Sequence, residues 1–344
     1  MFLDKSTSEK TESIQEIAIK LLEEQIRVLE IDNDPKERTI FILGSKGVGK
    51  STAINSFFEK EELVRPTLAL EYTYGKRTSS TQGIQKQILH VWELGSLENS
   101  EQLIDVPLRS HGANNFAVIL FIDLSQPKTL WLDLDNAYKG LKNAYTNLLN
   151  ETELAVFMEK SIERVGKEHS DQSIMMDLFP FPLIIVGGKY DIFMDFDPEL
   201  KKHICRCLRS MAHVLGASLL FYSKQIPKLA KTMRDTISHL GYGSPTQPFR
   251  SVNIDYNAPL SVWFGSDNWD QIGTNPNSIE QIGLIYCQEV PQTENTNSNV
   301  INDPAKDPGF QESIIDELRE QKNQELAALI KENEMRGKFE TIDG

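Results

Sequence analysis

The sequence predicts an α/β fold: a six-stranded, mainly parallel sheet with helices on both faces, followed by an extended C-terminal arm and helix. Short β-type segments alternate with helical ones between residues 39 and 242, which is the pattern of strands joined by crossover helices. Two segments, AVILFIDL and PLIIVGG, are apolar at consecutive positions, as expected for central strands that are buried on both faces. The apolar fraction of 40% and the charged fraction of 25% fit a chain that folds around a buried core.

The first predicted element is an amphipathic helix within residues 1–36. Apolar residues recur there at steps of three and four between positions 14 and 29, so they form one face of a helix. Six strands follow, which we expect to form the sheet. Their predicted ranges are 39–43, 67–74, 87–94, 117–124, 183–186 and 218–222.

The segments between and after these strands complete the predicted organisation. A helical and polar insert over residues 130–170 is longer than one crossover needs. A helix over residues 198–216 begins with Pro198 and ends with Gly216, which is the usual punctuation of helix ends. The pattern then loosens, so we predict a domain over 37–245, an extended arm and linker over 246–310, and a C-terminal helical tail over 311–344.

Charge and composition indicate which partners are not expected. The formal net charge is −14 and the sequence has no concentrated basic patch, so its field repels nucleic-acid phosphates and anionic lipids. No run of about 18 apolar residues is present, and we expect no membrane insertion and a cytoplasmic location. Cys205, Cys207 and Cys287 have neither paired disulfide spacing nor zinc-ligand spacing.

A glycine-rich loop follows the first strand and precedes a helix. It reads GSKGVGKS and matches G-x-x-x-x-G-K-[ST], the pattern of a loop whose backbone N–H groups cradle phosphates. Lys50 would neutralise the phosphates and Ser51 would place a hydroxyl on a bound Mg²⁺. Thr67 is a second candidate Mg²⁺ ligand, although it is equally well read as an ordinary strand-opening threonine. The predicted contact residues are Gly44, Ser45, Lys46, Gly47, Val48, Gly49, Lys50, Ser51 and Thr52.

A second motif, GGKYD, follows the fifth strand and bears on the nucleotide base. Ras-like proteins carry Asn-Lys-x-Asp there to recognise guanine; Lys189 and Asp191 match that motif, whereas Gly188 takes the place of the asparagine. Ser223 and Lys224 stand where such domains carry a Ser-Ala-Lys loop around the base. The sequence therefore predicts a Ras-like P-loop domain that favours guanine. It leaves open whether the site holds GTP or GDP with Mg²⁺ or remains nucleotide-free.

The residues that support hydrolysis in Ras-like proteins are less complete. Their second switch reads Asp-x-x-Gly followed by a water-orienting glutamine. Here Gly95 is kept, but Trp92 stands at the aspartate position and Ser96 at the glutamine position, with Glu93 as a carboxylate shifted by one residue. We expect no fast intrinsic hydrolysis from these residues, and slow GTP hydrolysis stays open.

Several stretches together resemble the light intermediate chains of cytoplasmic dynein 2. They are PTLALEYTYGKR, HVWELGS, PFPLIIVGGKYDIFMDF, GASLLFYSK and INDPAKDP, and the resemblance runs from about residue 37 to residue 320. It implies a non-catalytic subunit whose Ras-like domain docks on the tail of the dynein 2 heavy chain. It also implies association with the other dynein 2 subunits and with intraflagellar transport trains, in the cytoplasm and in the axoneme and basal body of cilia.

Two other functions remain open from the sequence. A ciliary Rab-like switching GTPase would need a shape change between its GTP and GDP forms, and the altered Trp92 to Ser96 segment disfavours it. A P-loop kinase for a small molecule is disfavoured by the base-recognition residues Lys189 and Asp191. Either the N-terminal helix or Trp263, Phe264 and Trp269 are candidates for the heavy-chain contact, and the alternative is that these aromatic residues cover the edge of the domain core.

Overall fold

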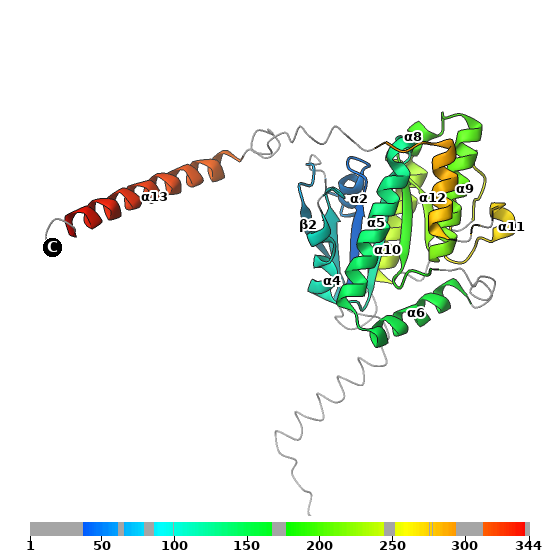
Figure 1. The fold of residues 1–344 in the computed structure, drawn as a ribbon, viewed down its shortest axis with the longest axis horizontal. Coiled ribbons are helices and arrows are strands. Elements are labelled where there is room, and N and C mark those ends of the chain that lie inside the picture. Colours follow the sequence, from blue (N-terminus) through cyan, green and yellow to red (C-terminus); the bar gives the residue numbers. More distant parts are fainter. Residues whose placement is uncertain are drawn as a thin grey trace, which may run out of the picture.

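The computed structural model describes residues 37–60, 65–78, 86–98, 100–166, 177–243, 252–274, 276, 278–293 and 312–340. The amphipathic helix predicted within residues 1–36 lies outside the described residues. Within them, a twisted sheet is covered by helices, and a separate long helix stands away from it (Figure 1).

The sheet has seven strands in the order β2-β3-β1-β4-β5-β6-β7. Pairing is parallel from β3 through β1, β4 and β5 to β6, whereas β2 and β7 are antiparallel to their neighbours. The strands are β1 (Glu37–Gly44), β2 (Leu70–Thr78), β3 (Lys86–Leu94), β4 (Phe116–Asp123), β5 (Leu183–Gly188), β6 (Ser218–Phe221) and β7 (Ser261–Val262). The mainly parallel α/β sheet is confirmed, but the predicted strand number of six is corrected to seven, because β7 adds to the edge of β6.

The central strands are apolar at consecutive positions because helices cover both faces of the sheet. Alternate residues enter two separate core clusters: Phe41 and Leu120 lie in one, and Ile42 and Phe121 in the other. The first cluster is covered by α5 (Pro127–Leu148), α9 (Pro198–Leu215) and α12 (Ile279–Glu289). The second is covered by α2 (Lys50–Phe57) and α10 (Pro227–Tyr242).

Helix boundaries follow local sequence signals. At the start of α9 the side chain of Asp197 accepts hydrogen bonds from the backbone N–H groups of Glu199 and Leu200, and the helix ends at Gly216 with φ of 60°. The insert between β4 and β5 forms α5 and then α6 (Glu151–Val165), which begins with a reciprocal cap between Asn150 and Glu153. The short helices are α3 (Glu101–Ile104), α4 (Val106–His111), α8 (Tyr190–Phe193) and α11 (Trp269–Ile272).

The segment predicted to be an extended arm is largely part of the domain. Tyr286 of α12 is fully buried, its ring stacks on Trp131 at 5.3 Å, and its hydroxyl donates to the carbonyl of Pro127. A buried ion pair joins Arg209 of α9 to Asp267. The predicted domain boundary at residue 245 is therefore corrected: the packed unit continues to residue 293, since β7, α11 and α12 complete its core.

The aromatic residues of this segment pack against the domain. Trp263 contacts His239 and Phe264, and Trp269 meets His213 edge-on at 4.4 Å. The sequence left open whether these aromatic residues contact the heavy chain or cover the edge of the domain core. Their contacts favour the second alternative.

The last described element, α13 (Ser313–Glu340), has a different environment. All of its described side chains are exposed, including six large apolar ones. Figure 1 shows it apart from the sheet and its covering helices. The exposed apolar residues are Ile314, Ile315, Leu318, Leu326, Leu329 and Ile330.

Candidate functional site

The glycine-rich loop connects β1 to α2 at the carboxyl edge of the sheet. Gly44 approaches β4 so closely that a Cβ atom there would lie 1.8 Å from the carbonyl oxygen of Phe121. Gly49, with φ of 106°, turns the chain into α2 in a conformation that favours glycine. The strand, loop and helix context that the motif requires is present.

Lys50 lies inside this loop. Its side chain is only 4% exposed, and its Nζ donates to the carbonyl oxygens of Gly44, Ser45 and Gly95 at 3.1, 2.8 and 3.2 Å. Burial lowers the pKa of Lys50 to about 8, against a smaller opposing effect of Glu93. The three acceptors are neutral carbonyl oxygens, and a phosphate in the loop would supply a negative counter-charge to the ammonium group.

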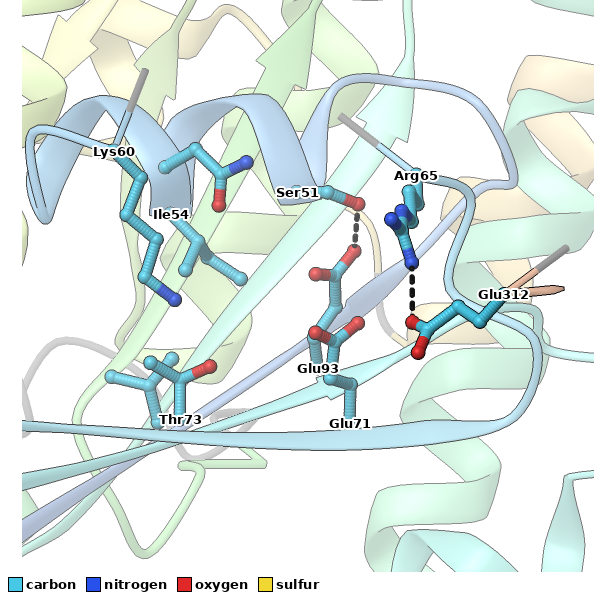
Figure 2. A pocket seen from close by; sticks show the side chains of 10 residues that line it. Ser51, Ile54, Lys60, Arg65, Glu71, Thr73, Glu93 and Glu312 are labelled. Carbon is cyan, nitrogen blue, oxygen red and sulfur yellow. Dashed lines mark hydrogen bonds and ion pairs between the residues drawn. The ribbon is translucent and has the colours of Figure 1, made fainter. Parts of the chain in front are cut away.

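Ser51 faces a carboxylate on the neighbouring strand. Its Oγ donates to Oε1 of Glu93 at 2.6 Å, and Thr67 Oγ1 donates to Oε2 of Glu71 at 3.1 Å (Figure 2). Glu93 is 5% exposed, and this burial raises the pKa of its carboxyl group. Ser51, Glu71 and Glu93 line a pocket of about 430 Å³. Ser51 and Thr67, the two predicted Mg²⁺ ligands, therefore lie at one site. Each donates to a glutamate that is not part of the glycine-rich motif.

The strand register explains why Glu93, and not Trp92, faces the loop. Successive side chains of β3 point to opposite faces of the sheet. Glu93 pairs with Ile42 in the register, and its side chain points to Ser51. The Trp92 side chain points to the other face, where the centroids of the Trp92 and Tyr72 rings are 4.8 Å apart. The sequence left open whether the carboxylate of Glu93, one residue after the motif's aspartate position, takes the place of that aspartate beside the loop. The structure places the Glu93 carboxylate there.

Asp133 of α5 is a further residue at the loop. Its carboxylate accepts a hydrogen bond from Ser45 Oγ, and burial raises its pKa. It lies 88 positions from Ser45, and nothing in its local sequence marks it as a loop contact.

The base-recognition residues lie together at the ends of β5 and β6. Ser223 Oγ donates to Oδ1 of Asp191 at 2.6 Å, so the acidic group is held in place. Lys189 has φ of 56°, and its Nζ forms an ion pair with Asp123 at 2.6 Å. Lys224 is exposed beside them. Four residues predicted from two separate motifs therefore occupy one end of the sheet.

The remaining predicted loop residues complete the picture. Lys46 and Gly47 are exposed at the tip, Val48 is buried, and Thr52 follows Ser51 in the first turn of α2. Val48 packs where a side chain at position 188 would otherwise sit, because a Cβ on Gly188 would lie 2.5 Å from Cγ2 of Val48.

The donor chemistry of these residues fits the phosphates of a nucleotide with Mg²⁺: an ammonium group and backbone N–H groups suit phosphate, and hydroxyl and carboxylate oxygens suit a hard cation. Within the described ranges, no group of three or more His, Cys, Asp or Glu side chains is placed to hold a metal ion. A cation at Ser51 would therefore rely on hydroxyl oxygens, waters or phosphates beside the carboxylates. In the same ranges, no helix has the length and apolar character needed to cross a membrane.

Comparison with known proteins identifies the family. No family model matches the chain. Curated relatives named cytoplasmic dynein 2 light intermediate chain 1 are 38% identical in Bos taurus over 309 residues, and 36% in Homo sapiens over 309 residues; each alignment covers 84% of this chain and 86% of the relative. The relative from Danio rerio is 35% identical over 308 residues and 85% of each chain.

A solved structure supports the fold. The crystal structure of the conserved domain of a dynein light intermediate chain matches with a TM-score of 0.53, at 18% identity, over 76% of this chain and 93% of that one. The Ras-like P-loop fold class predicted from the sequence is confirmed. With more than a third of its residues identical over most of its length to those of the curated relatives, the chain belongs to the family of cytoplasmic dynein 2 light intermediate chains.

Proposed function

We propose that this chain is a non-catalytic subunit of the cytoplasmic dynein 2 motor. In this role it binds and stabilises the tail of the heavy chain for retrograde intraflagellar transport during cilium assembly and maintenance. The observation that carries the proposal is the 36–38% identity over 84% of the chain to proteins named as light intermediate chains of that motor. Its partners would be the dynein 2 heavy chain, the other subunits and the transport trains, in the cytoplasm and at the axoneme and basal body.

The glycine-rich loop has a structural role in this proposal. Bound GTP or GDP with Mg²⁺ would neutralise Lys50 and hold the loop on the sheet, without a cycle of hydrolysis. Trp92 supports this role because it packs with Tyr72 away from the loop, and the Ser96 side chain instead accepts a hydrogen bond from the backbone N–H of Glu98. Neither side chain is placed to orient an attacking water.

Helix α13 offers a surface for a subunit contact. Its six exposed large apolar side chains recur at helical spacing, so they lie on one side of the helix, although polar residues interrupt them. Large apolar side chains that lie exposed together on one side of a helix are characteristic of interaction sites. A partner helix from the motor would cover it.

The proposal is tested by purifying the tagged chain from ciliated cells, identifying its partners by mass spectrometry, and separating the nucleotide that denaturation releases. Recovery of the dynein 2 heavy chain with unhydrolysed or absent nucleotide is the expected result. A variant with Ile315, Leu318, Leu326 and Leu329 changed to serine should recover less heavy chain at an unchanged melting temperature. The matched control changes Asp316, Glu320 and Gln324, on the opposite side of α13, to serine.

One observation favours the Rab-like switching GTPase as a second candidate. Glu93 keeps a carboxylate beside Ser51, on the side where a switch protein senses its metal and phosphate. A set of partners that binds only the GTP form, with no heavy chain recovered, would replace the subunit proposal with this one.

A further inference from the structure

Strand β2 forms one edge of the sheet. It pairs with β3 along all nine of its residues, Leu70–Thr78, and among the described strands it has no neighbour on its other side (Figure 1). An edge strand presents a row of backbone N–H and C=O groups that can pair with another chain, and natural sheets usually shorten, bend or cover such an edge. The register of β2 runs without a break, so its open edge is a candidate contact surface.

The hydrogen-bond register shows which residues direct their backbone groups to this edge. The carbonyl oxygen of Ala69 accepts from the N–H of Gly95 at 2.7 Å, which marks these two residues as a hydrogen-bonded pair. In an antiparallel pair, such residues alternate with residues whose backbone groups point away from the partner strand. The odd-numbered residues of β2 therefore bond to β3. The backbone groups that point to the open edge belong to Leu70, Tyr72, Tyr74, Lys76 and Thr78.

Large exposed side chains accompany these backbone groups. Tyr72 is 42% exposed and Tyr74 is 52% exposed, and the centroids of their rings are 6.3 Å apart on one face of the strand. Nζ of Lys76 lies 5.3 Å from the centroid of the Tyr74 ring. The hydroxyl of Tyr72 is hydrogen-bonded to Nδ1 of His90 at 2.8 Å, which holds the Tyr72 ring in place. This face of β2 thus offers two aromatic rings and a cation to a neighbouring strand.

The opposite face of β2 carries one acidic and one basic residue at its two ends. Glu71 accepts a hydrogen bond from Thr67, and the guanidinium carbon of Arg77 lies 5.7 Å from the centroid of the Tyr242 ring. Both Glu71 and Arg77 are exposed. Within the described part of the chain, neither of them forms an ion pair.

This sequence of side chains is complementary to itself. When two β2 strands pair antiparallel about Tyr74, the outward backbone groups of each strand meet those of the other. In that register Glu71 of each copy faces Arg77 of the other, and Tyr72 faces Lys76. Each pair occurs twice because of the two-fold symmetry, and no like charges stand opposite each other. A shift of two residues would place Glu71 opposite Gly75, or Arg77 opposite Thr73, and lose the match.

We propose that two copies of this chain associate through β2, in a two-fold antiparallel pairing centred on Tyr74 that joins their seven-stranded sheets into one. Backbone hydrogen bonds supply the affinity, as in other cases of strand addition to a sheet edge. The ion pairs of Glu71 with Arg77 and the contacts of Tyr72 with Lys76 select the register. The contact goes beyond the proposed subunit role and needs neither heavy chain nor nucleotide.

The test measures the self-association of the full chain by sedimentation velocity over a series of concentrations at physiological salt, which screens the net charge of −14 on each copy. A dimer that dissociates on dilution is expected. Arg77→Glu and Glu71→Arg each place like charges opposite each other at two positions, and each should weaken self-association at least about tenfold. An equal mixture of the two variants should form a dimer again, because every glutamate then faces an arginine.

A backbone variant tests the strand pairing itself. Tyr74→Pro removes an N–H that points to the open edge, and it leaves the bonds between β2 and β3 intact. It should give a monomer. Arg234→Glu, the same charge change at an exposed position of α10, is the matched control and should keep the dimer. Circular dichroism melts of each variant show that a lost dimer is not a lost fold.

Three outcomes would overturn the inference. A chain that is monomeric at every concentration leaves the edge of β2 to a strand of another protein. A dimer that survives Arg77→Glu, Glu71→Arg and Tyr74→Pro is formed by a different surface, such as the apolar side of α13. Single variants that lose the dimer without regaining it in the mixture contradict the register. Recovery of the heavy chain from cells tests the proposed function separately, and its result does not depend on this contact.

Discussion

Gly188 shows how a single residue can depart from a motif for a steric reason. It stands where Ras-like proteins carry the asparagine of Asn-Lys-x-Asp, at the end of β5 beneath the glycine-rich loop. A Cβ at this position would lie 2.5 Å from Cγ2 of Val48 and 3.0 Å from its carbonyl oxygen. The loop occupies the space that the asparagine would need, so its tether to the sheet is made by packing in place of an amide.

Restoring the motif residue should therefore damage the protein. Gly188→Ala and Gly188→Asn are expected to lower the free energy of unfolding by about 1–3 kcal/mol, because the stiff Val48 side chain and its backbone must shift. Urea denaturation measures the loss. Gly140→Ala, within helix α5, is the matched control. A Cβ on Gly140 would meet only the flexible end of the Ile104 side chain. Tighter GDP binding by a fully stable Gly188→Asn chain would contradict the steric explanation.

The three cysteines differ in access and in thiolate content. Burial raises the pKa of Cys205 and of Cys207 to about 12, whereas Cys287 is partly exposed and its pKa is raised less. A higher thiol pKa means less thiolate at pH 8, so the thiols of Cys205 and Cys207 react slowly. With Ellman's reagent we expect one fast thiol per folded chain and three after denaturation. Loss of the fast phase in Cys287→Ser identifies it, and fast reaction of a second thiol in the folded chain would refute the assignment.

Residues of the candidate site divide by how far their partners lie along the chain. Lys50, Ser51, Lys189 and Asp191 could be named from the sequence because their spacing within short motifs reports the local backbone. Asp133 could not, because its contact with Ser45 depends on how helix α5 packs over the loop. The position of Glu93 was ambiguous for a related reason: one residue of register decides which face of the sheet a side chain occupies.

At the scale of elements, a buried ion pair fixes the segment after residue 252 to helix α9. Nε and one terminal nitrogen of Arg209 donate to the two carboxylate oxygens of Asp267 at 2.8 and 2.6 Å, and both residues are more than nine-tenths buried. The third contact of the guanidinium group is the carbonyl of Gln271 in α11. Removal of either partner leaves a charge without compensation.

We expect Asp267→Asn to cost about 3–5 kcal/mol in the free energy of unfolding, since the guanidinium group stays buried without its counter-charge. Arg209→Met with Asp267→Leu should cost less than either single change, because no charge is then buried. Guanidinium denaturation of the set measures this coupling. Lys139→Met, which breaks an exposed pair with Asp135, should change stability by less than about 1 kcal/mol. Equal losses in the exposed and buried single variants would contradict the prediction.

Elements with strong periodicity were predicted well, and elements fixed by distant contacts were not. The helix at residues 198–216 has punctuation at both ends and appears where expected. Strand β7 has only two residues, too few for any alternating pattern, and exists because β6 offers it an edge. Gln292 lies beyond α12, yet its side-chain oxygen accepts from the backbone N–H groups of Trp131 and Leu132 in the second turn of α5. No local pattern marks such a contact.

For the whole molecule, these contacts define where the folding unit ends. A chain that ends at residue 245 lacks Tyr286 and Ile282, which are almost fully buried, together with β7. It should expose the first core cluster and be recovered as aggregate. A chain that ends at residue 298 keeps all of these contacts and should unfold in one cooperative transition. Size-exclusion chromatography and thermal unfolding distinguish the two, and a soluble, cooperative shorter chain would contradict the corrected boundary.

The two ends of this folded unit lie at opposite ends of the parallel strands. The described chain enters at Glu37, the first residue of β1, and leaves near Thr293, whose N–H donates to the carbonyl of Lys128 beyond the far end of β4. Strand β1 lies between β3 and β4 and is parallel to both. A pull between the two ends therefore acts along β1, and the hydrogen bonds on its two sides share the load in shear and do not open one after another. This arrangement makes the domain stiff against a pull applied between its two ends.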